Sequence, residues 1–128
     1  MSKIKQLISV DCEKSPKREV CGFVVFEEDE YKILPAENKS PNKENEFYIP
    51  AKDFLYVKNT KNVVAIYHSH AQGNSEPSEF DKKTCDLICY PFVIYSIETN
   101  TFNILKPKYM DADHSLVKKL EEEILWLK

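Results

Sequence analysis

Glycine is nearly absent from this chain, with 2 residues in 128. A glycine-rich loop that cradles a phosphate is therefore excluded as the basis of function. Long apolar runs are missing as well, which argues against a signal peptide or a membrane span and favours a cytoplasmic protein with no membrane partner. The formal net charge of -3 offers no basic surface for nucleic acid.

Cysteine is also scarce, with 4 residues at Cys12, Cys21, Cys85 and Cys89. An even number could form disulfides in a secreted protein. Without a secretory signal, reduced and mostly buried thiols are the better interpretation. Cys85 and Cys89 would share a helix face, but no further pair of ligands lies nearby to complete a metal site.

The residues that are present describe an ordinary globular protein, with 42% hydrophobic and 30% charged residues. The length suits a single domain. Apolar runs at 20–26 and 63–67 predict buried strands, with a return strand at 31–34, a hairpin at 92–97 and 101–105, and a short strand at 47–49. Helices are expected at 2–12, from 50, from 78, and over 113–127. The pattern predicts an α/β (α+β) fold, with a central sheet flanked by about four helices.

Helical spacing also predicts which side chains face the core. The residues expected to point inward are Phe54, Leu55 and Val57, then Phe80, Thr84, Leu87 and Ile88, and finally Leu116, Leu120, Ile124 and Leu127. Gly22, inside a strand, indicates a place where another backbone approaches closely. The polar residues 35–46 predict a surface loop.

The segment from His68 to Asp81 carries the candidate chemistry. Histidines at positions 68 and 70, at the end of a strand, point to the same side because side chains alternate along a strand. Asp81, in the first turn of the next helix, can fold back to join them. Three protein ligands leave a fourth tetrahedral position for water, as in a catalytic zinc site.

A second interpretation applies to part of this segment. Ser78 and Asp81 have the spacing of a helix capping box, in which the serine accepts a hydrogen bond from a backbone N–H. The two interpretations are compatible, since a helix start can hold Asp81 rigidly toward a metal. Capping alone accounts for neither histidine.

The complete pattern resembles the signature of the JAMM metallopeptidases, also called the JAB/MPN domain. His68-x-His70, seven residues, Ser78, two residues and Asp81 match at each defined position, and Glu19-Val-Cys-Gly22 supplies the family's glutamate before the first buried strand. The resemblance covers residues 1–106 and implies a JAMM/cytidine-deaminase-like mixed sheet flanked by helices. Residues 107–128 are then expected to form an amphipathic helix packed on the same domain.

Further details resemble the prokaryotic branch, and within it the JAMM domain of phage tail assembly proteins of the lambda K type. These are Asn45-Glu-Phe47, Pro77-Ser78, and Pro91-Phe-Val-Ile94 after a cysteine-bearing helix. This likeness implies an alternative location, in association with phage or virion. Asn38 and Asn45 fall in the loop that borders the active site in related enzymes, where substrate contact is a hypothesis.

The resemblance implies a zinc-dependent metallopeptidase or isopeptidase. His68, His70 and Asp81 would hold one Zn²⁺ per chain, Glu19 would be the general base, and Ser78 would stabilise the oxyanion. The expected partner is a protein or peptide substrate, either the tail of a ubiquitin-like or sulfur-carrier protein or a phage tail protein.

Two other functions stay open. One is a catalytically silent MPN-type scaffold, which predicts a broken motif, whereas all five residues are intact here. The other is a cell-wall amidase in a phage context, for which the sequence offers no defensible sugar-binding platform of aromatic residues. The sequence leaves the oligomeric state open.

Overall fold

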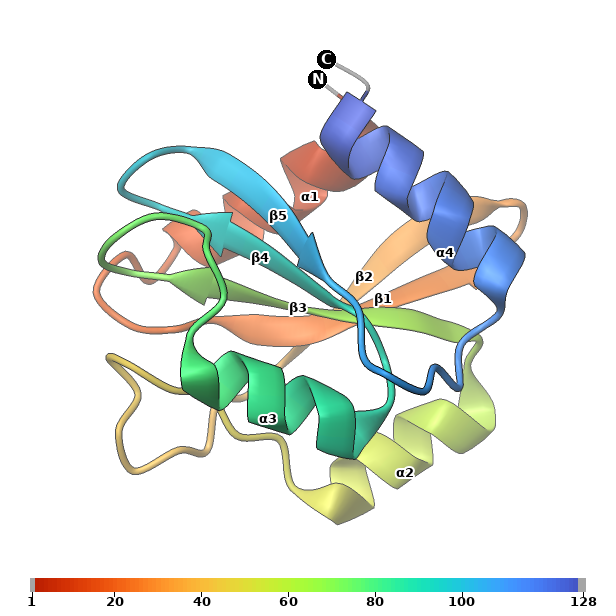
Figure 1. Cartoon of the computed structure of the whole chain (residues 1–128), viewed down its shortest axis with the longest axis horizontal. Coiled ribbons are helices and arrows are strands. Elements are labelled where there is room, and N and C mark those ends of the chain that lie inside the picture. The colour runs from red at the N-terminus through yellow and green to blue at the C-terminus, as the bar shows by residue number, and fades with distance from the viewer. Residues whose placement is uncertain (1, 127–128) are drawn as a thin grey trace.

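The computed structural model of the protein describes residues 2–126. Its centre is a five-stranded sheet with strand order β2-β1-β3-β4-β5 (Figure 1). The strands are β1 (Cys21–Glu27), β2 (Glu30–Ala36), β3 (Val63–His70), β4 (Phe92–Ser96) and β5 (Thr101–Leu105). All eight residues of β3, the central strand, are buried, as expected of a strand covered on both faces.

The sheet is mixed. β1 runs antiparallel to both β2 and β3, β3 and β4 are parallel, and β5 returns antiparallel to β4. The parallel pair needs a crossover connection, and the helix α3 (Glu79–Ile88) provides it. The predicted α/β fold with a central mixed sheet is confirmed.

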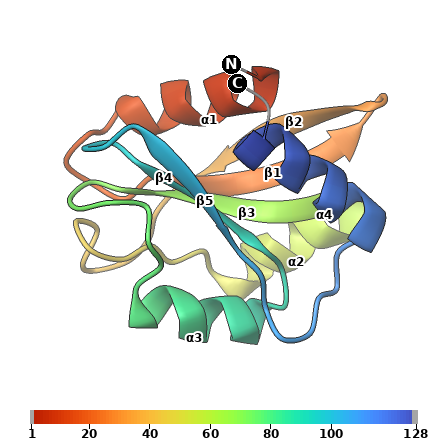
Figure 2. The ribbon, with the colours of Figure 1, turned by 45° about the horizontal axis from the view of Figure 1, so that its top comes forward.

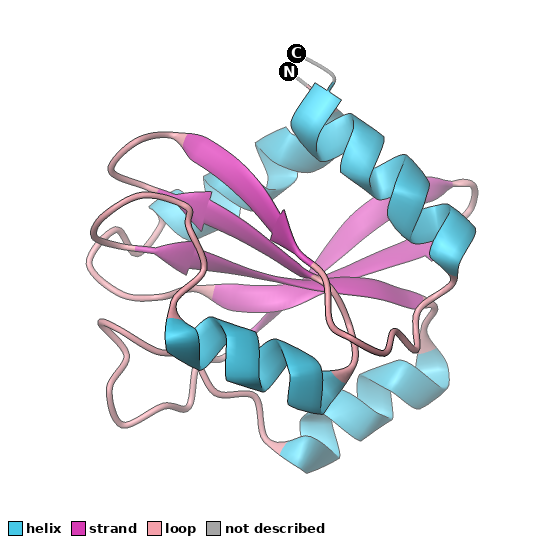
Figure 3. Ribbon diagram, viewed as in Figure 1, coloured by secondary structure: helices cyan, strands magenta, loops and turns pink. Residues whose placement is uncertain are grey.

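Helices cover both faces of the sheet. α1 (Lys3–Glu13), α4 (His114–Glu121) and its π-helical continuation η1 (Glu122–Trp126) lie on one face, while α2 (Ala51–Thr60) and α3 lie on the other (Figures 2 and 3). Ser2 and Asp113 cap α1 and α4, as the sequence predicted for the helix starts. Within residues 2–126, no helix is both long enough and apolar enough to cross a membrane.

Several predicted details are wrong. Residues 47–49 form no strand but irregular backbone leading into α2. Leu55, Phe80 and Leu87 are exposed, Leu87 by 84%. The inner face of α3 is set by Asp81 and Cys85, one turn apart, so Phe80 and Leu87 turn away from the sheet. In the last helix Leu120 and Ile124 are buried and Leu116 is partly buried, whereas Leu127 lies outside the described residues.

Gly22 does mark a close approach, but of a side chain rather than a backbone. It lies opposite Tyr67 in the β1–β3 register, and a Cβ atom there would meet the Tyr67 ring at 2.5 Å. The ring passes over the glycine, so that the Tyr67 hydroxyl donates to Asp11 Oδ2 of α1 at 2.6 Å. The glycine therefore allows the sheet to be bonded to α1 beneath the candidate site.

Candidate metal centre

Successive side chains of β3 point to opposite faces of the sheet, so that structural side chains lie on one face and candidate functional side chains on the other. Tyr67 and Ser69 face α1, and the Ser69 hydroxyl accepts a 2.8 Å hydrogen bond from the Val20 N–H. His68 and His70 therefore face the opposite side, toward α3. Ser69 thus points away from the two histidines and has a structural role.

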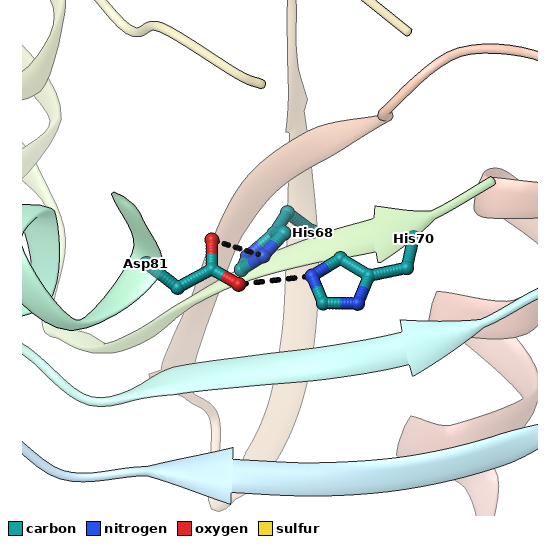
Figure 4. A group of neighbouring side chains, drawn as sticks. All are labelled: His68, His70 and Asp81. Carbon is teal, nitrogen blue, oxygen red and sulfur yellow. Dashed lines mark hydrogen bonds and ion pairs between the residues drawn. The ribbon is translucent and has the colours of Figure 1, made fainter. Parts of the chain in front are cut away.

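Asp81 reaches between the two imidazoles from the first turn of α3 (Figure 4). Its Oδ1 lies 3.1 Å from His68 Nε2, and its Oδ2 lies 2.9 Å from His70 Nε2. One ligand atom from each of the three residues lies within 4.8 Å of the others. The structure thus brings together all three residues that the sequence proposed as metal ligands.

His70 is oriented by a backbone carbonyl. Its Nδ1 donates to the carbonyl oxygen of Asn74 at 2.9 Å, which leaves Nε2 directed at Asp81. Burial disfavours the charged ring, but the bonds to Asp81 and Asn74 outweigh it, so the pKa of His70 is raised. A carbonyl acceptor on the far nitrogen is the usual way in which proteins fix a ligating histidine.

His68 is held by packing instead. The ring is fully buried, and apart from the 3.1 Å contact of Nε2 with Asp81 neither nitrogen has a polar partner among the described residues. Phe47 stacks on it with centroids 4.6 Å apart, and Phe92 meets it edge-on at 5.4 Å. Burial outweighs the attraction of Asp81 and lowers the pKa of His68, which favours the neutral ring. A buried imidazole whose nitrogen lone pair has no donor is suited to a metal ion.

Ser78 and Asp81 form the predicted capping box. Ser78 Oγ accepts from the Asp81 N–H, and Asp81 Oδ2 accepts from the Ser78 N–H, both at 3.0 Å. Burial opposes ionisation of Asp81, but these contacts and the two imidazoles hold its pKa well below the usual range. The Ser78 hydroxyl accepts one bond and retains its own hydrogen for another acceptor.

The dimensions of the cluster fit one metal ion. Donor atoms about 2.0–2.1 Å from a tetrahedral ion lie about 3.3 Å apart. The observed separations of 3.1 Å and 2.9 Å are slightly shorter, as expected for polar groups in direct contact. His68, His70 and Asp81 therefore form a cluster that could bind a metal ion.

Glu19 lies beside this cluster. The β1–β3 register pairs Cys21 with His68, and continuing it by two residues sets Glu19 beside His70. Glu19 is 6% exposed, and its Oε1 has no hydrogen-bond partner among residues 2–126. Burial, reinforced by Asp81 and opposed by His70, raises the pKa of Glu19 to about 8. A pKa near neutrality is the property required of a general base.

Because the pKa of Glu19 is raised, ionisation of its carboxyl should lower the free energy of unfolding of the metal-free protein. The pKa is 4.5 in an unperturbed carboxyl and about 8 in the fold. As the pH rises through this window, the unfolded chain releases the proton first, so the folded state loses stability. We expect Glu19→Gln to unfold like the wild type near pH 4 and to be more stable above about pH 8, with an upper limit of about 5 kcal/mol.

Urea unfolding with a chelator at about pH 5, pH 7 and pH 9 measures this difference. Glu46→Gln, which removes a nearby carboxylate without touching the buried position, is the matched control. A stability difference between Glu19→Gln and wild type that does not change with pH would contradict the assignment.

The structure also places the residues whose role the sequence left open. Asn45 is exposed and donates only to Asn42. Asn38 uses all of its hydrogen-bonding positions within the protein, which argues against the hypothesis of substrate contact. His114 is exposed at the start of α4. The sequence did not indicate that Phe47 lies against His68, since it predicted Phe47 only as part of a short strand at 47–49.

A mixed sheet covered by helices on both faces, with a buried cluster of two histidines and an aspartate, defines a candidate metal-binding α/β domain. The family model described as prokaryotic homologs of the JAB domain matches residues 1–107. The chain belongs to this family.

The chain is also similar to individual proteins. The tail tip assembly protein K of Escherichia phage N15 is 31% identical over 91 residues, which are 71% of this chain; the match spans 37% of that protein's length. A solution structure of a protein from Desulfitobacterium hafniense has a TM-score of 0.58 at 15% identity, covering 88% of this chain and 92% of that one, and so shares the fold. A JAB1/MPN domain protein from Archaeoglobus fulgidus has a TM-score of 0.48 at 15% identity, with 80% and 85% covered.

Proposed function

We propose that this chain is a zinc metallopeptidase that hydrolyses an amide bond in a protein or peptide. The observation that carries the proposal is the convergence of His68, His70 and Asp81, with the carboxyl of Glu19 beside them, whose Oε1 has no hydrogen-bond partner within residues 2–126. Two imidazoles and one carboxylate are a common ligand set of catalytic zinc. A zinc ion held there would act as a Lewis acid and lower the pKa of a water molecule to about 7.

The chain's own residues supply the proton transfers. Glu19 would take a proton from the attacking water and deliver it to the nitrogen of the leaving amine, which requires a carboxyl that exchanges protons near neutral pH. Ser78 would donate its hydroxyl hydrogen to the oxyanion that develops on the scissile carbonyl, a contribution on the order of 3 kcal/mol. Capping of α3 fixes the position of that hydroxyl.

An apolar groove next to the cluster supports a peptide as the substrate. It has a volume of about 350 Å³ between α2 and α3 and begins at Phe47, the residue stacked on His68. Apolar and aromatic side chains dominate its walls: Phe47, Tyr48, Ile49, Ala51, Phe54, Ile66, Phe80, Leu87 and Ile88, together with Thr84. Side chains that flank a scissile amide could bury apolar surface there.

Two substrate classes fit this proposal. Similarity to the tail tip assembly protein of phage N15 favours a protein of the phage tail, with the chain acting in association with phage or virion. The flexible tail of a ubiquitin-like or sulfur-carrier protein remains the other predicted partner, since an extended chain can lie in the groove beside the site.

Cleavage of a peptide library tests the activity directly. The zinc-loaded protein is incubated with peptides from a digested proteome, and new termini are identified by mass spectrometry. We expect new termini that disappear with a chelator, return when zinc is restored, and have large apolar residues enriched near the cut. If zinc-loaded protein generates no new termini, in this library or on intact phage tail and ubiquitin-like proteins, the scaffold alternative replaces the peptidase.

A further inference from the structure

The segment 37–50, which joins β2 to α2, has no regular secondary structure but is organised around one side chain. The Asn38 amide donates to the carbonyl oxygens of Glu19 at 2.8 Å and Glu46 at 2.9 Å. Its Oδ1 accepts from the N–H groups of Ser40 at 3.0 Å and Tyr48 at 3.1 Å. Two donors and two accepted bonds exhaust what an asparagine side chain can make.

The backbone of Glu19 depends on this segment. Glu19 precedes β1, which begins at Cys21. Its N–H donates to the Lys43 carbonyl at 2.7 Å, and its carbonyl accepts from Asn38. The buried Oε1 has no hydrogen-bond partner among the described residues, so the position of the carboxyl follows from how its backbone is held.

The same side chain also secures the aromatic residue on the other side of the site. The N–H of Tyr48 donates to Asn38 Oδ1 at 3.1 Å. The carbonyl oxygen of Tyr48 accepts from the Lys39 N–H at 3.0 Å. Phe47, directly before it, is buried and stacks on His68. Apart from its contact with Asp81, His68 has no polar partner within residues 2–126, so packing by such rings contributes to its orientation.

We propose that Asn38 is a positioning residue that links the two halves of the site. It fixes the backbone of Glu19 on one side and, through Tyr48, the ring of Phe47 against His68 on the other. Its importance for catalysis rests on the proposed function, whereas the linkage itself can be tested in the metal-free protein. The structure assigns Asn38 no contact with substrate, since its polar atoms are all engaged.

Asn38→Ala removes the link, and Asn45→Ala is the matched control, an asparagine of the same segment with one exposed bond to Asn42. Carbon-13 NMR of labelled glutamate follows the carboxyl of Glu19 in metal-free protein, with Glu19→Gln assigning the signal. We expect a midpoint near 8 in wild type and Asn45→Ala. In Asn38→Ala the carboxyl reaches water, and its midpoint should fall by about 1 pH unit or more.

The charged groups that act on Glu19 are His70, Asp81 and Glu46, and all are retained in both variants.

Zinc affinity, measured by competition with a chromophoric chelator, is the second measurement. Losing a partner outside the ligand shell costs about 10- to 100-fold in metal affinity. We expect about a 10-fold loss in Asn38→Ala, because the ring that packs on His68 is loosened, and no change in Asn45→Ala.

A folded Asn38→Ala protein with the wild-type midpoint and the wild-type zinc affinity would overturn the proposal. If that variant does not fold, Asn38→Ser is used for the same comparison. A serine hydroxyl at position 38 can still accept from the Ser40 N–H, whereas the bond to the Glu19 carbonyl is lost. Asn38→Ser should lower the midpoint in the same way, and an unchanged midpoint there also overturns the proposal. Wild-type protein that binds no zinc would defeat the proposed function but leave the midpoint comparison valid.

Discussion

Purified without chelators and without a histidine tag, the chain is expected to carry about one zinc ion per molecule, and the variants Asp81→Ala and His70→Ala are expected to carry almost none. Each variant removes one of three protein ligands from a cluster whose donor atoms lie within 4.8 Å of one another. Loss of an outer partner already weakens metal binding by about 10- to 100-fold, so loss of a ligand should exceed about 100-fold. Elemental mass spectrometry measures the content.

Asp81 has a second role that the experiment has to separate from metal binding. It closes the capping box of α3, and loss of a cap costs on the order of 1 kcal/mol of stability. Asp81→Asn keeps an oxygen for the Ser78 N–H but removes the negative charge, so it should retain the helix and still bind zinc poorly. His114→Ala, which removes the exposed histidine of α4, is the control with full zinc content.

The contrary outcome is also clear. Wild-type protein that is isolated without metal and takes up no added zinc at neutral pH would remove the basis of the peptidase proposal. The buried contact between Asp81 and the two histidines would then be an internal polar network, and the scaffold interpretation would lead. Exposed apolar side chains on α2 and α3, such as Leu55 and Leu87, would be the first surface to test for a partner.

The three metal-binding candidates were predictable from sequence because the signal is local. A strand of alternating side chains places His68 and His70 on one face, and a capped helix begins a short loop later with Asp81 in its first turn. Continuous apolar runs, hairpin signals and helical spacing also predicted the five strands and the helices. Glu19 lies far away in the sequence, and its position was supplied by the family resemblance.

The surroundings of the cluster could not be predicted in the same way. Phe47 stacks on His68 from a segment that has no periodic pattern, and its neighbours Glu46 and Tyr48 are bonded to Asn38. The partner of Gly22 required the β1–β3 register, which sequence alone did not specify. Leu87 fits an apolar helical stripe, but Asp81 and Cys85 determine the buried face of α3.

The second large effect is expected at Glu19. Zinc-loaded Glu19→Gln should hydrolyse the substrate found in the peptide library about 100- to 10,000-fold more slowly than wild type, the usual contribution of a positioned acid–base group. Glutamine has nearly the same shape but cannot accept the proton of the attacking water. Because Glu19 is not among the three clustered ligands, the variant should retain its zinc.

The measurement is kcat/KM with the zinc content determined on the same sample. Glu46→Gln serves as the control, since it removes a neighbouring carboxylate that lies outside the cluster and should leave the rate within about 3-fold of wild type. A Glu19→Gln protein with full zinc and nearly wild-type activity would assign proton transfer to another group. A loss of zinc in this variant would instead make Glu19 part of the metal site. Only loss of rate with retained metal fits a buried carboxyl, unpaired within residues 2–126, whose pKa lies near neutrality beside the cluster.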